Sequence, residues 1–487
     1  MILAACVVLL PSFFFGPPAV DSGAYNYSWT LQFGEALARG EWYPRWLPRS
    51  NDGFGSPTFY FYPPLAFYLS GAIHLLGVPV WQAINVAGLL ALAASGLTMA
   101  RWLREVGGHP AGAVLFVVAP YHLGDFYTRA AFAEFVAYLW LPVIALAMTT
   151  RHRWSGPVLA LAYAGLIGTH LPLAVLTGVL LMPPLALHAA WRLGRADLRF
   201  LAERAGWALL GVGLSAVYLV PALTLQSHTS MGQKRPAMFQ PFTWSVWHVP
   251  EEFRTALLCF ASIAAGGVVL AVAAAQRERS VRFWAGLTVG IAALAVGVVP
   301  WLWLLPVLKR VEFPWRTLAL LEFAAITAWA MRPPSRVLVG VALLVATFGI
   351  ASQLTWGVMA VRGSTLELRR QIAADLWDPP EYLPPTFRQR ATEALDHSVD
   401  QARLRAFAVQ RPGQTVYRQL DFPSWEAERY GVRVPKGKGP LVTVDGEGRG
   451  VRLMRRTLPE ERAGWWISLG AAAVYAAALI TRRRVGA

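Results

Sequence analysis

Acidic residues lie beside apolar stretches at two places in this 487-residue chain. Asp21 follows the first apolar run directly, where a carboxylate can accept a proton from a hydroxyl group or bind a divalent cation. The alternative is a solvated acid at a helix end. Asp125 and Glu134 flank Arg129, at four and five residues. One helix would bring Arg129 close to Asp125, either within a catalytic site or as an ion pair that stabilises a short helix.

Basic side chains and one histidine extend this set. His170 lies between two apolar runs, as a site residue or as a hydrogen-bonded core residue. Lys309 and Arg310 precede Phe313-Pro-Trp-Arg316, and Arg suits bidentate phosphate binding. Interfacial snorkelling is the alternative for these cations, and Lys234-Arg235 are a further candidate or plain surface charges. The sequence has no Walker motif and no HExxH motif, so we predict neither a nucleotide site nor a zinc protease.

The elements that must position these residues are membrane-spanning helices. Hydrophobic residues make up 55% of the chain and charged residues only 15%, against about 25% in soluble domains. A span needs about 20 apolar residues. We therefore predict a polytopic α-helical membrane protein with about 12 spans, at 2–18, 79–101, 110–122, 135–150, 156–170, 171–190, 206–222, 255–275, 282–304, 314–331, 336–360 and 464–481. The first run is interpreted as a retained span rather than a cleaved signal peptide.

The charge distribution orients these spans. The net charge is +16, and alternate connections hold 16 Arg against four acids, whereas the rest of the chain has 28 basic and 24 acidic residues. Basic connections mark the cytoplasmic side, so the charge reflects topology and we expect no nucleic acid partner. Cys6 and Cys259 lie inside apolar runs, which predicts no disulfide framework.

Two large segments then fall outside the cytoplasm, and all the candidate site residues map to that face. We divide the chain into a multi-span domain, 1–361, a β-rich domain, 362–463, and a last span with a basic tail, 464–487. The first domain carries an extracytoplasmic loop at 21–64, with a helix at Trp29–Arg39 and a short helix at 65–78 after it. Aromatic residues at 42–62 favour the membrane interface or stack on sugars. Within the β-rich domain we predict a helix at Ser364–Leu376 and strands at Arg405–Val409, Thr415–Leu420, Tyr430–Val434, Leu441–Val444 and Val451–Met454.

A series of motifs along nearly the whole chain resembles a known family. They are Gly40-Glu-Trp-Tyr-Pro-Arg45-Trp46, Gly53-Phe-Gly-Ser-Pro57, Phe59-Tyr-Phe-Tyr-Pro-Pro64, Pro120-Tyr121, Arg129-Ala-Ala-Phe-Ala-Glu134, Thr169-His170, Phe313-Pro-Trp-Arg316, Asp421-Phe-Pro-Ser-Trp425 and Gly464-Trp-Trp-Ile-Ser468. In this order they resemble the bacterial YfhO-like membrane proteins, in particular the "6-pyruvoyl-tetrahydropterin synthase-related" set. These proteins resemble the glycosyltransferase C superfamily. We discount the pterin activity, because that soluble enzyme needs a His-rich zinc site and this chain shows none.

The resemblance implies a glycosyltransferase C-like enzyme in the plasma (inner) membrane of a bacterium. It would move a sugar from a polyprenyl-phosphate donor, held among membrane lipid, to a glycan, lipid or protein acceptor of the cell envelope on the extracytoplasmic side. The implied catalytic residues are Asp21, Asp125 and Glu134. The implied substrate-binding residues are Arg129, His170, Arg316, Arg45, Tyr25, Lys309 and Arg310.

A divalent cation, Mg or Mn, is a possible cofactor, with Asp21 and Asp125 as its ligands. Relatives often show Asp-x-x-x-His where this chain has Asp21 and Tyr25, which puts a histidine-assisted metal role in doubt here. The rival interpretation is a transporter or flippase for lipid-linked glycans, or a non-catalytic assembly subunit. A transporter would show paired broken helices in two similar halves, and the sequence shows no such repeat. Convergence of Asp21, Asp125 and Glu134 on one site would favour the enzyme.

Overall fold

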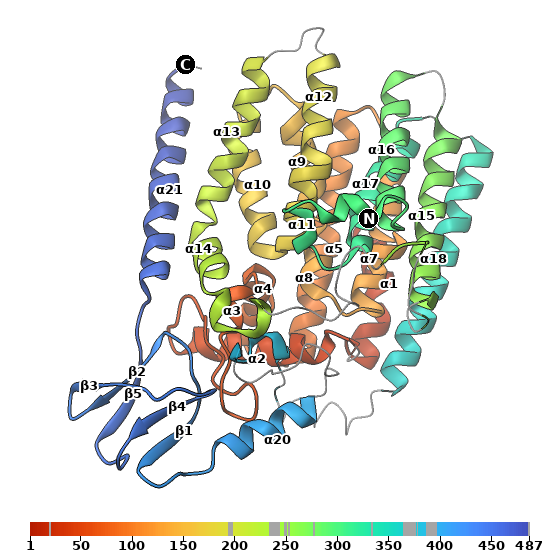
Figure 1. Ribbon diagram of the computed structural model, residues 1–487. Helices are drawn as coiled ribbons and strands as arrows, with labels where there is room; N and C mark the ends of the chain where they lie inside the picture. Colours follow the sequence, from red (N-terminus) through yellow and green to blue (C-terminus); the bar gives the residue numbers. More distant parts are fainter. Residues whose placement is uncertain are drawn as a thin grey trace.

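A computed structural model of the chain describes residues 1–18, 21–192, 198–232, 244–247, 251, 254–275, 278–332, 335–363, 376, 378–385 and 397–485. It is a helical bundle with a small group of β-strands at one end (Figure 1). The helices are α1 (Ile2–Phe15), α2 (Gly23–Ala38), α3 (Thr58–Phe61), α4 (Leu65–Leu75), α5 (Val80–Glu105), α6 (Ala111–Val117), α7 (Pro120–Tyr127), α8 (Phe132–Ala137), α9 (Trp140–Thr149), α10 (Ser155–Thr169), α11 (Leu171–Leu176), α12 (Met182–Arg192), α13 (Leu198–Leu214), α14 (Ala216–Thr224), α15 (Arg254–Ala274), α16 (Arg279–Ala295), α17 (Leu318–Ala330), α18 (Arg336–Gly363), α20 (His397–Phe407) and α21 (Pro459–Val485).

Membrane-spanning length is reached by only part of this set. Within the described residues, five helices or helix runs are long and apolar enough to cross a membrane, and a sixth if the bent pair α13 and α14 counts as one span. The prediction of many apolar helices is therefore confirmed, but the number of twelve is not. The predicted span at 110–122 is instead two short helices, α6 and α7, and the one at 282–304 ends as an α-helix at Ala295.

The bend between α13 and α14 is 70°. Such a break exposes backbone groups that lipid cannot satisfy. Two distant side chains satisfy them here: Ser468 Oγ of α21 accepts from Val217 N at 2.8 Å, and Arg45 Nη2 donates to Val217 O at 2.7 Å. That carbonyl is free because Pro221, four residues on, has no N–H to donate to it.

The basic connections gather at one end of the bundle. Arg482 near the end of α21 donates to the Arg153 carbonyl oxygen at 2.7 Å and pairs with Glu203 of α13. At the opposite end, the first loop meets the strands, where Leu420 N donates to Phe54 O at 2.8 Å. This separation agrees with the predicted orientation of basic connections on one side and the two large segments on the other.

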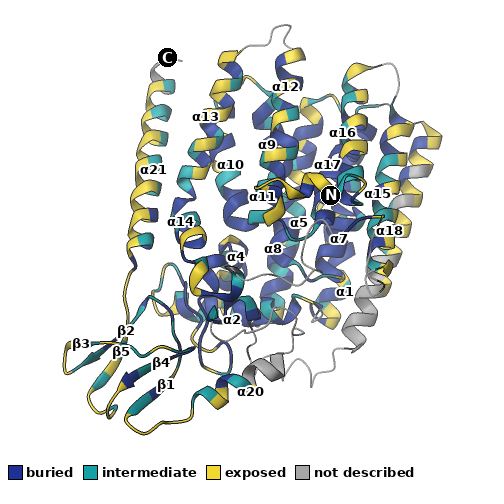
Figure 2. Ribbon diagram, viewed as in Figure 1, coloured by how far each residue is buried: buried dark blue, intermediate teal, exposed yellow. Residues whose placement is uncertain are grey.

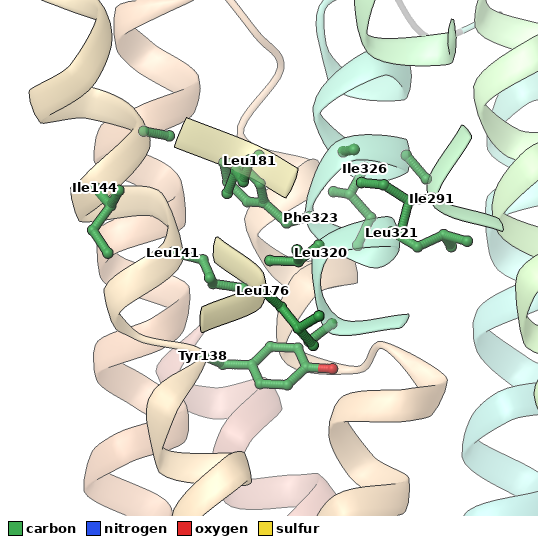
Figure 3. Close-up of a cluster of buried hydrophobic side chains, with 14 of the residues drawn as sticks. Tyr138, Leu141, Ile144, Leu176, Leu181, Ile291, Leu320, Leu321, Phe323 and Ile326 are labelled. Atoms are coloured by element: carbon green, nitrogen blue, oxygen red, sulfur yellow. The ribbon is translucent and has the colours of Figure 1, made fainter. Parts of the chain in front are cut away.

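The core of the bundle surrounds α17, whose 13 residues are all buried. Leu176 of α11, Leu181 of the π-turn Thr177–Leu181, and Leu320 and Phe323 of α17 pack together with Tyr138 and Leu141 (Figure 3). The described side chains of α18 and α21 are largely exposed (Figure 2), as apolar helix faces in contact with lipid would be.

Five strands form two small sheets. β1 (Gln414–Leu420) pairs with β4 (Leu441–Asp445), and β2 (Trp425–Arg429) pairs with β3 (Val432–Val434) and β5 (Val451–Arg455), all antiparallel. The predicted β-rich region is thus confirmed, with β2 missed. The strand predicted at Arg405–Val409 is wrong: its first three residues end helix α20, where Leu404 is buried and Arg405 and Ala406 are exposed. The helix predicted at Ser364–Leu376 lies outside the described residues except for Leu376.

The predicted helices at Trp29–Arg39 and 65–78 are present as α2 and α4. The aromatic loop at 42–62 does not simply lie at the membrane interface. Trp46 and Tyr60 are buried against Phe422 and Trp425 of the β-rich region, with ring centroids 4.9–6.1 Å apart, while Trp42 is exposed. These rings join the first loop to the β-rich region, because burying a large aromatic surface stabilises such a contact.

Candidate functional site

Arg129 is the centre of a buried polar cluster. Its Nη1 donates to Asp125 Oδ1 at 2.5 Å, to Glu134 Oε2 at 3.0 Å and to the Tyr121 hydroxyl at 2.8 Å. Asp125 lies in α7, Glu134 in the first turn of α8, and Arg129 in the link between them. The predicted proximity of Asp125 and Arg129 is therefore present, and Glu134 joins them.

Glu134 contacts cations and a hydrogen-bond donor from three segments. Its Oε1 accepts from Tyr121 OH at 2.8 Å, and its Oε2 lies 3.5 Å from Arg316 Nε as well as near Arg129. Both carboxylate oxygens are therefore engaged. Asp125 differs, because its Oδ2 is buried and makes no hydrogen bond among the described residues. Arg316 Nε is also buried and makes no hydrogen bond with the described residues, so its N–H can still donate one.

His170 lies at the edge of this cluster. Its Nδ1 accepts from Leu173 N at 3.3 Å and so caps the start of α11. A neutral ring that accepts at Nδ1 carries its proton on Nε2. That nitrogen lies 3.8 Å from Glu134 Oε2, which is beyond hydrogen-bond distance. His170 therefore satisfies a helix terminus and lies beside the cluster, and its substrate-binding role stays a prediction.

Asp21 is the accessible acid of the group. Its side chain is exposed, at the turn before α2, and the next residue, Ser22, donates from its N–H to Arg129 O at 3.3 Å. Surrounding protein atoms raise the pKa of the Asp21 carboxyl by partial desolvation, while the positive charges of Arg129 and Arg316 act to lower it. Asp21 thus lies within the electrostatic reach of the two arginines that Glu134 holds.

Two residues at this junction have a left-handed backbone. Asp21 has φ 47° and Ala130 has φ 46°. Asn26 of α2 fixes their relative position, because its Nδ2 donates to Ala130 O at 2.6 Å. Left-handed conformations cost energy for residues other than glycine, and such strain clusters at functional sites. The adjoining cavity, beside Gly23 and Asn26, measures only about 10 Å³. A sugar would need the surrounding segments to move apart.

Sequence reasoning missed Glu322, which supports this cluster from α17. Its Oε1 accepts from Tyr121 N at 2.6 Å, and its Oε2 accepts from His122 N at 3.2 Å and Tyr138 OH at 3.1 Å. Glu322 thereby caps the N-terminus of α7 and positions Tyr121. The available signal was a single acid inside an otherwise apolar run, which is rare without a function or a partner.

The remaining predicted residues do not join the cluster. Arg45 pairs with Glu461 of α21, Nε to Oε2 at 3.1 Å, and also bonds Val217 O. Tyr25 is half-buried in α2 and stacks on Trp29 at 5.7 Å. Lys309 and Arg310 are exposed on a 3₁₀ turn and form no ion pair with a residue that the structure describes. Lys234-Arg235 fall outside the described residues.

The described side chains do not assemble a metal site. Among them, no three His, Cys, Asp or Glu gather closely enough to hold an ion. Asp125 is instead neutralised by Arg129, and Asp21 faces Arg129 and Arg316. The positive charges beside these two acids are guanidinium groups. The Mg or Mn predicted at Asp21 and Asp125 stays untested.

Neither a family model nor a curated protein matches the chain. The solved structures that are similar at low identity include the following two. One is arabinofuranosyltransferase AftD from mycobacteria, with 21% identity and a TM-score of 0.46. The match covers 74% of this chain and 26% of the AftD chain. The other is ArnT from Cupriavidus metallidurans bound to undecaprenyl phosphate, with 16% identity, a TM-score of 0.45 and coverages of 77% and 73%. The chain spans about a quarter of AftD. These scores are too low to establish a shared fold.

Proposed function

We propose that the chain is a membrane glycosyltransferase of the glycosyltransferase C type. It moves a sugar from a polyprenyl-phosphate donor to a glycan, lipid or protein acceptor on the extracytoplasmic side of a bacterial inner membrane. The observation that carries this proposal is the convergence of Asp21, Asp125, Glu134 and two arginines at one place. The motif resemblance supports the same activity.

The acids in this proposal have different roles. Asp21 is the general base, because it is the exposed carboxylate of the cluster and its pKa is raised towards the working range of a base. Glu134 has both oxygens engaged and holds the arginines in place. Asp125 orients Arg129 by a bond of 2.5 Å.

The reaction is a single displacement. Asp21 removes the proton from the acceptor hydroxyl, whose oxygen forms a bond to the anomeric carbon of the donor sugar. The bond between that carbon and the phosphate oxygen breaks, and the polyprenyl phosphate leaves with the electron pair. Arg316, whose buried Nε–H makes no hydrogen bond with the described residues, stabilises the phosphate together with Arg129.

The proposal is tested with purified protein in lipid, radiolabelled polyprenyl-phosphate sugars and a membrane extract as acceptor. Asp21→Asn should reduce transfer by about 10²-fold or more, the range typical of a lost general base. Asp52→Asn is the matched control. Asp52 is also an aspartate of the first loop with a left-handed backbone, φ 57°, but it pairs with Arg405 and Arg418 outside the cluster.

Transfer that survives in Asp21→Asn would remove Asp21 as the base. Loss of transfer in both variants would assign the effect to the loop rather than to the carboxylate. Adding a chelator tests the cation separately, because charge balance by Arg129 and Arg316 predicts that activity persists without free Mg²⁺ or Mn²⁺. Donor movement across liposomes without transfer would favour the flippase.

A further inference from the structure

Residues of α12 and α16 line a groove. The two helices lie away from the strands, toward the other end of the bundle (Figure 1). Its cavity volume is about 930 Å³, within the range of about 300–1,000 Å³ that small-molecule sites occupy. None of its lining residues belongs to the cluster around Arg129. The groove is therefore a different site from the one proposed for sugar transfer.

The floor of the groove is a ring stack that joins the two helices. The His188 ring of α12 lies on the Phe283 ring of α16, with centroids 4.0 Å apart and planes 9° from parallel. Beside this stack, Val179, Pro183 and Leu187 present exposed apolar side chains. The helix is irregular here, because a short π-helix at Thr177–Leu181 precedes α12. Apolar walls on the outside of a membrane-spanning bundle accommodate an acyl chain.

The rim of the groove is basic. Arg279 and Arg282 line it from the first turn of α16, both exposed, and Arg279 Cζ lies 5.7 Å from the Trp191 ring centroid. The exposed Glu278 precedes these two arginines. Positive side chains at the N-terminal end of a helix, which is itself positive, favour a bound anion.

This end of the bundle is the one with basic connections. His109 N, after α5, donates to Ala330 O at the end of α17, and Arg332 donates to Ala273 O at the end of α15. The α16 N-terminus follows α15 directly in the chain. Basic pockets between helices on the cytoplasmic side of a membrane are where anionic lipid headgroups bind.

We propose that this groove binds an anionic glycerophospholipid. The phosphate headgroup contacts Arg279 and Arg282, Trp191 lies at the headgroup level, and one acyl chain follows Val179 and Leu187. A free phosphate would use only the rim, whereas a lipid uses both the arginines and the apolar wall. The combination of the two chemistries in one groove selects the lipid.

The test uses full-length protein in detergent and native mass spectrometry with phosphatidylglycerol or phosphatidylcholine of the same acyl chains. Phosphatidylglycerol should bind more tightly. Arg279→Gln with Arg282→Gln should weaken it by about 30-fold, from about five- to sixfold per arginine at a membrane surface. Val179→Trp, at a position already exposed, should also weaken it by filling the apolar wall.

The matched control is Arg101→Gln with Arg104→Gln. These two arginines are also three residues apart and exposed, on the last turns of α5 at the same end of the bundle, but outside the groove. Their removal should leave phosphatidylglycerol binding unchanged. Equal binding of the two lipids, or an unchanged Arg279/Arg282 variant, would overturn the proposal. Displacement of phosphatidylglycerol by equimolar undecaprenyl phosphate would overturn it too, and would assign the groove to the lipid carrier.

Discussion

The indole Nε1 of Trp29 donates to Asp378 Oδ1 at 2.6 Å, across 349 residues of sequence. Thr58 donates to the other carboxyl oxygen. This buried aspartate therefore attaches the segment before strand β1 to the first loop and to α2. The start of α2 also positions Asp21. Burial raises the pKa of Asp378 to about 7.

That raised pKa makes stability depend on pH. The folded state holds the Asp378 proton more tightly than the unfolded chain, whose aspartate has a pKa of 3.8. The free energy of unfolding should therefore fall as pH rises between these values and level off above pH 7, by a total on the order of 4 kcal/mol. Asp378→Asn keeps an acceptor oxygen for Trp29, so it should abolish most of this fall. Thermal unfolding in detergent between pH 5 and pH 8 measures it, and an equal fall in both proteins would contradict the assignment.

The charge of Glu134 should matter more for stability than that of Glu322. Glu134→Gln leaves Arg129 and Arg316 under-compensated in a buried site, a situation that costs about 3–5 kcal/mol. Glu322→Gln should cost less, about 1–2 kcal/mol, because the glutamine oxygen still accepts from the Tyr121 N–H. The midpoints of thermal unfolding of the two variants compare them directly. A smaller loss in Glu134→Gln than in Glu322→Gln would show that the arginines are balanced elsewhere.

The pH dependence of transfer should report Asp21. A general base must be deprotonated, so the rate rises with pH through the pKa of the group. Protein atoms around Asp21 raise that pKa above 3.8, and Arg316 opposes the rise. Removing the cation in Arg316→Gln should therefore move the acid limb of kcat/KM to higher pH, whatever its effect on KM. An acid limb at the same pH in the wild type and in Arg316→Gln would show that Arg316 does not influence the pKa of the base.

Gly55 should tolerate no side chain. Its φ is +82°, and a Cβ atom there would lie 2.5 Å from Trp46 Nε1, inside the packing against Phe422 and Trp425. Gly55→Ala combines backbone strain with overpacking, so it should cost about 3 kcal/mol or more. Gly53→Ala is its control, with φ +78° and open space around the Cβ position, and should cost about 1–2 kcal/mol. Thermal unfolding measures the loss of stability in the two variants. Equal losses would mean that the Trp46 side chain moves aside for the added methyl group.

Local patterns predicted the parts of the site that are close in sequence. The spacing of Asp125 and Arg129 predicted their contact, although α7 ends at Tyr127 and Arg129 lies in the link that follows it. Glu322 was missed because its partners, Tyr121 and Tyr138, lie about two hundred residues away and no spacing rule connects them. The position of the aromatic loop was missed for a similar reason. A segment rich in aromatic residues has the same composition whether its rings lie at the membrane interface or are buried against a distant sheet.

The helix count shows a similar limit. Apolar composition predicts helices, but it does not show where a helix breaks. At Ser215 and Pro221 the chain turns because Arg45 and Ser468 supply hydrogen bonds to the freed backbone of Val217. Both of those residues come from parts of the chain far from α14. Such breaks depend on tertiary partners, which the sequence does not connect.

The contacts of Glu461 have a consequence for how the protein is made. This residue bonds Tyr60 across 401 residues and pairs with Arg45. At about 5–20 residues per second, translation needs about 20–80 s to add that length. During this interval the first loop has left the ribosome with its arginine unpaired and its rings uncovered. Membrane insertion must therefore protect a half-assembled intermediate, and a chain stalled before Glu461 would be a substrate for quality-control proteases.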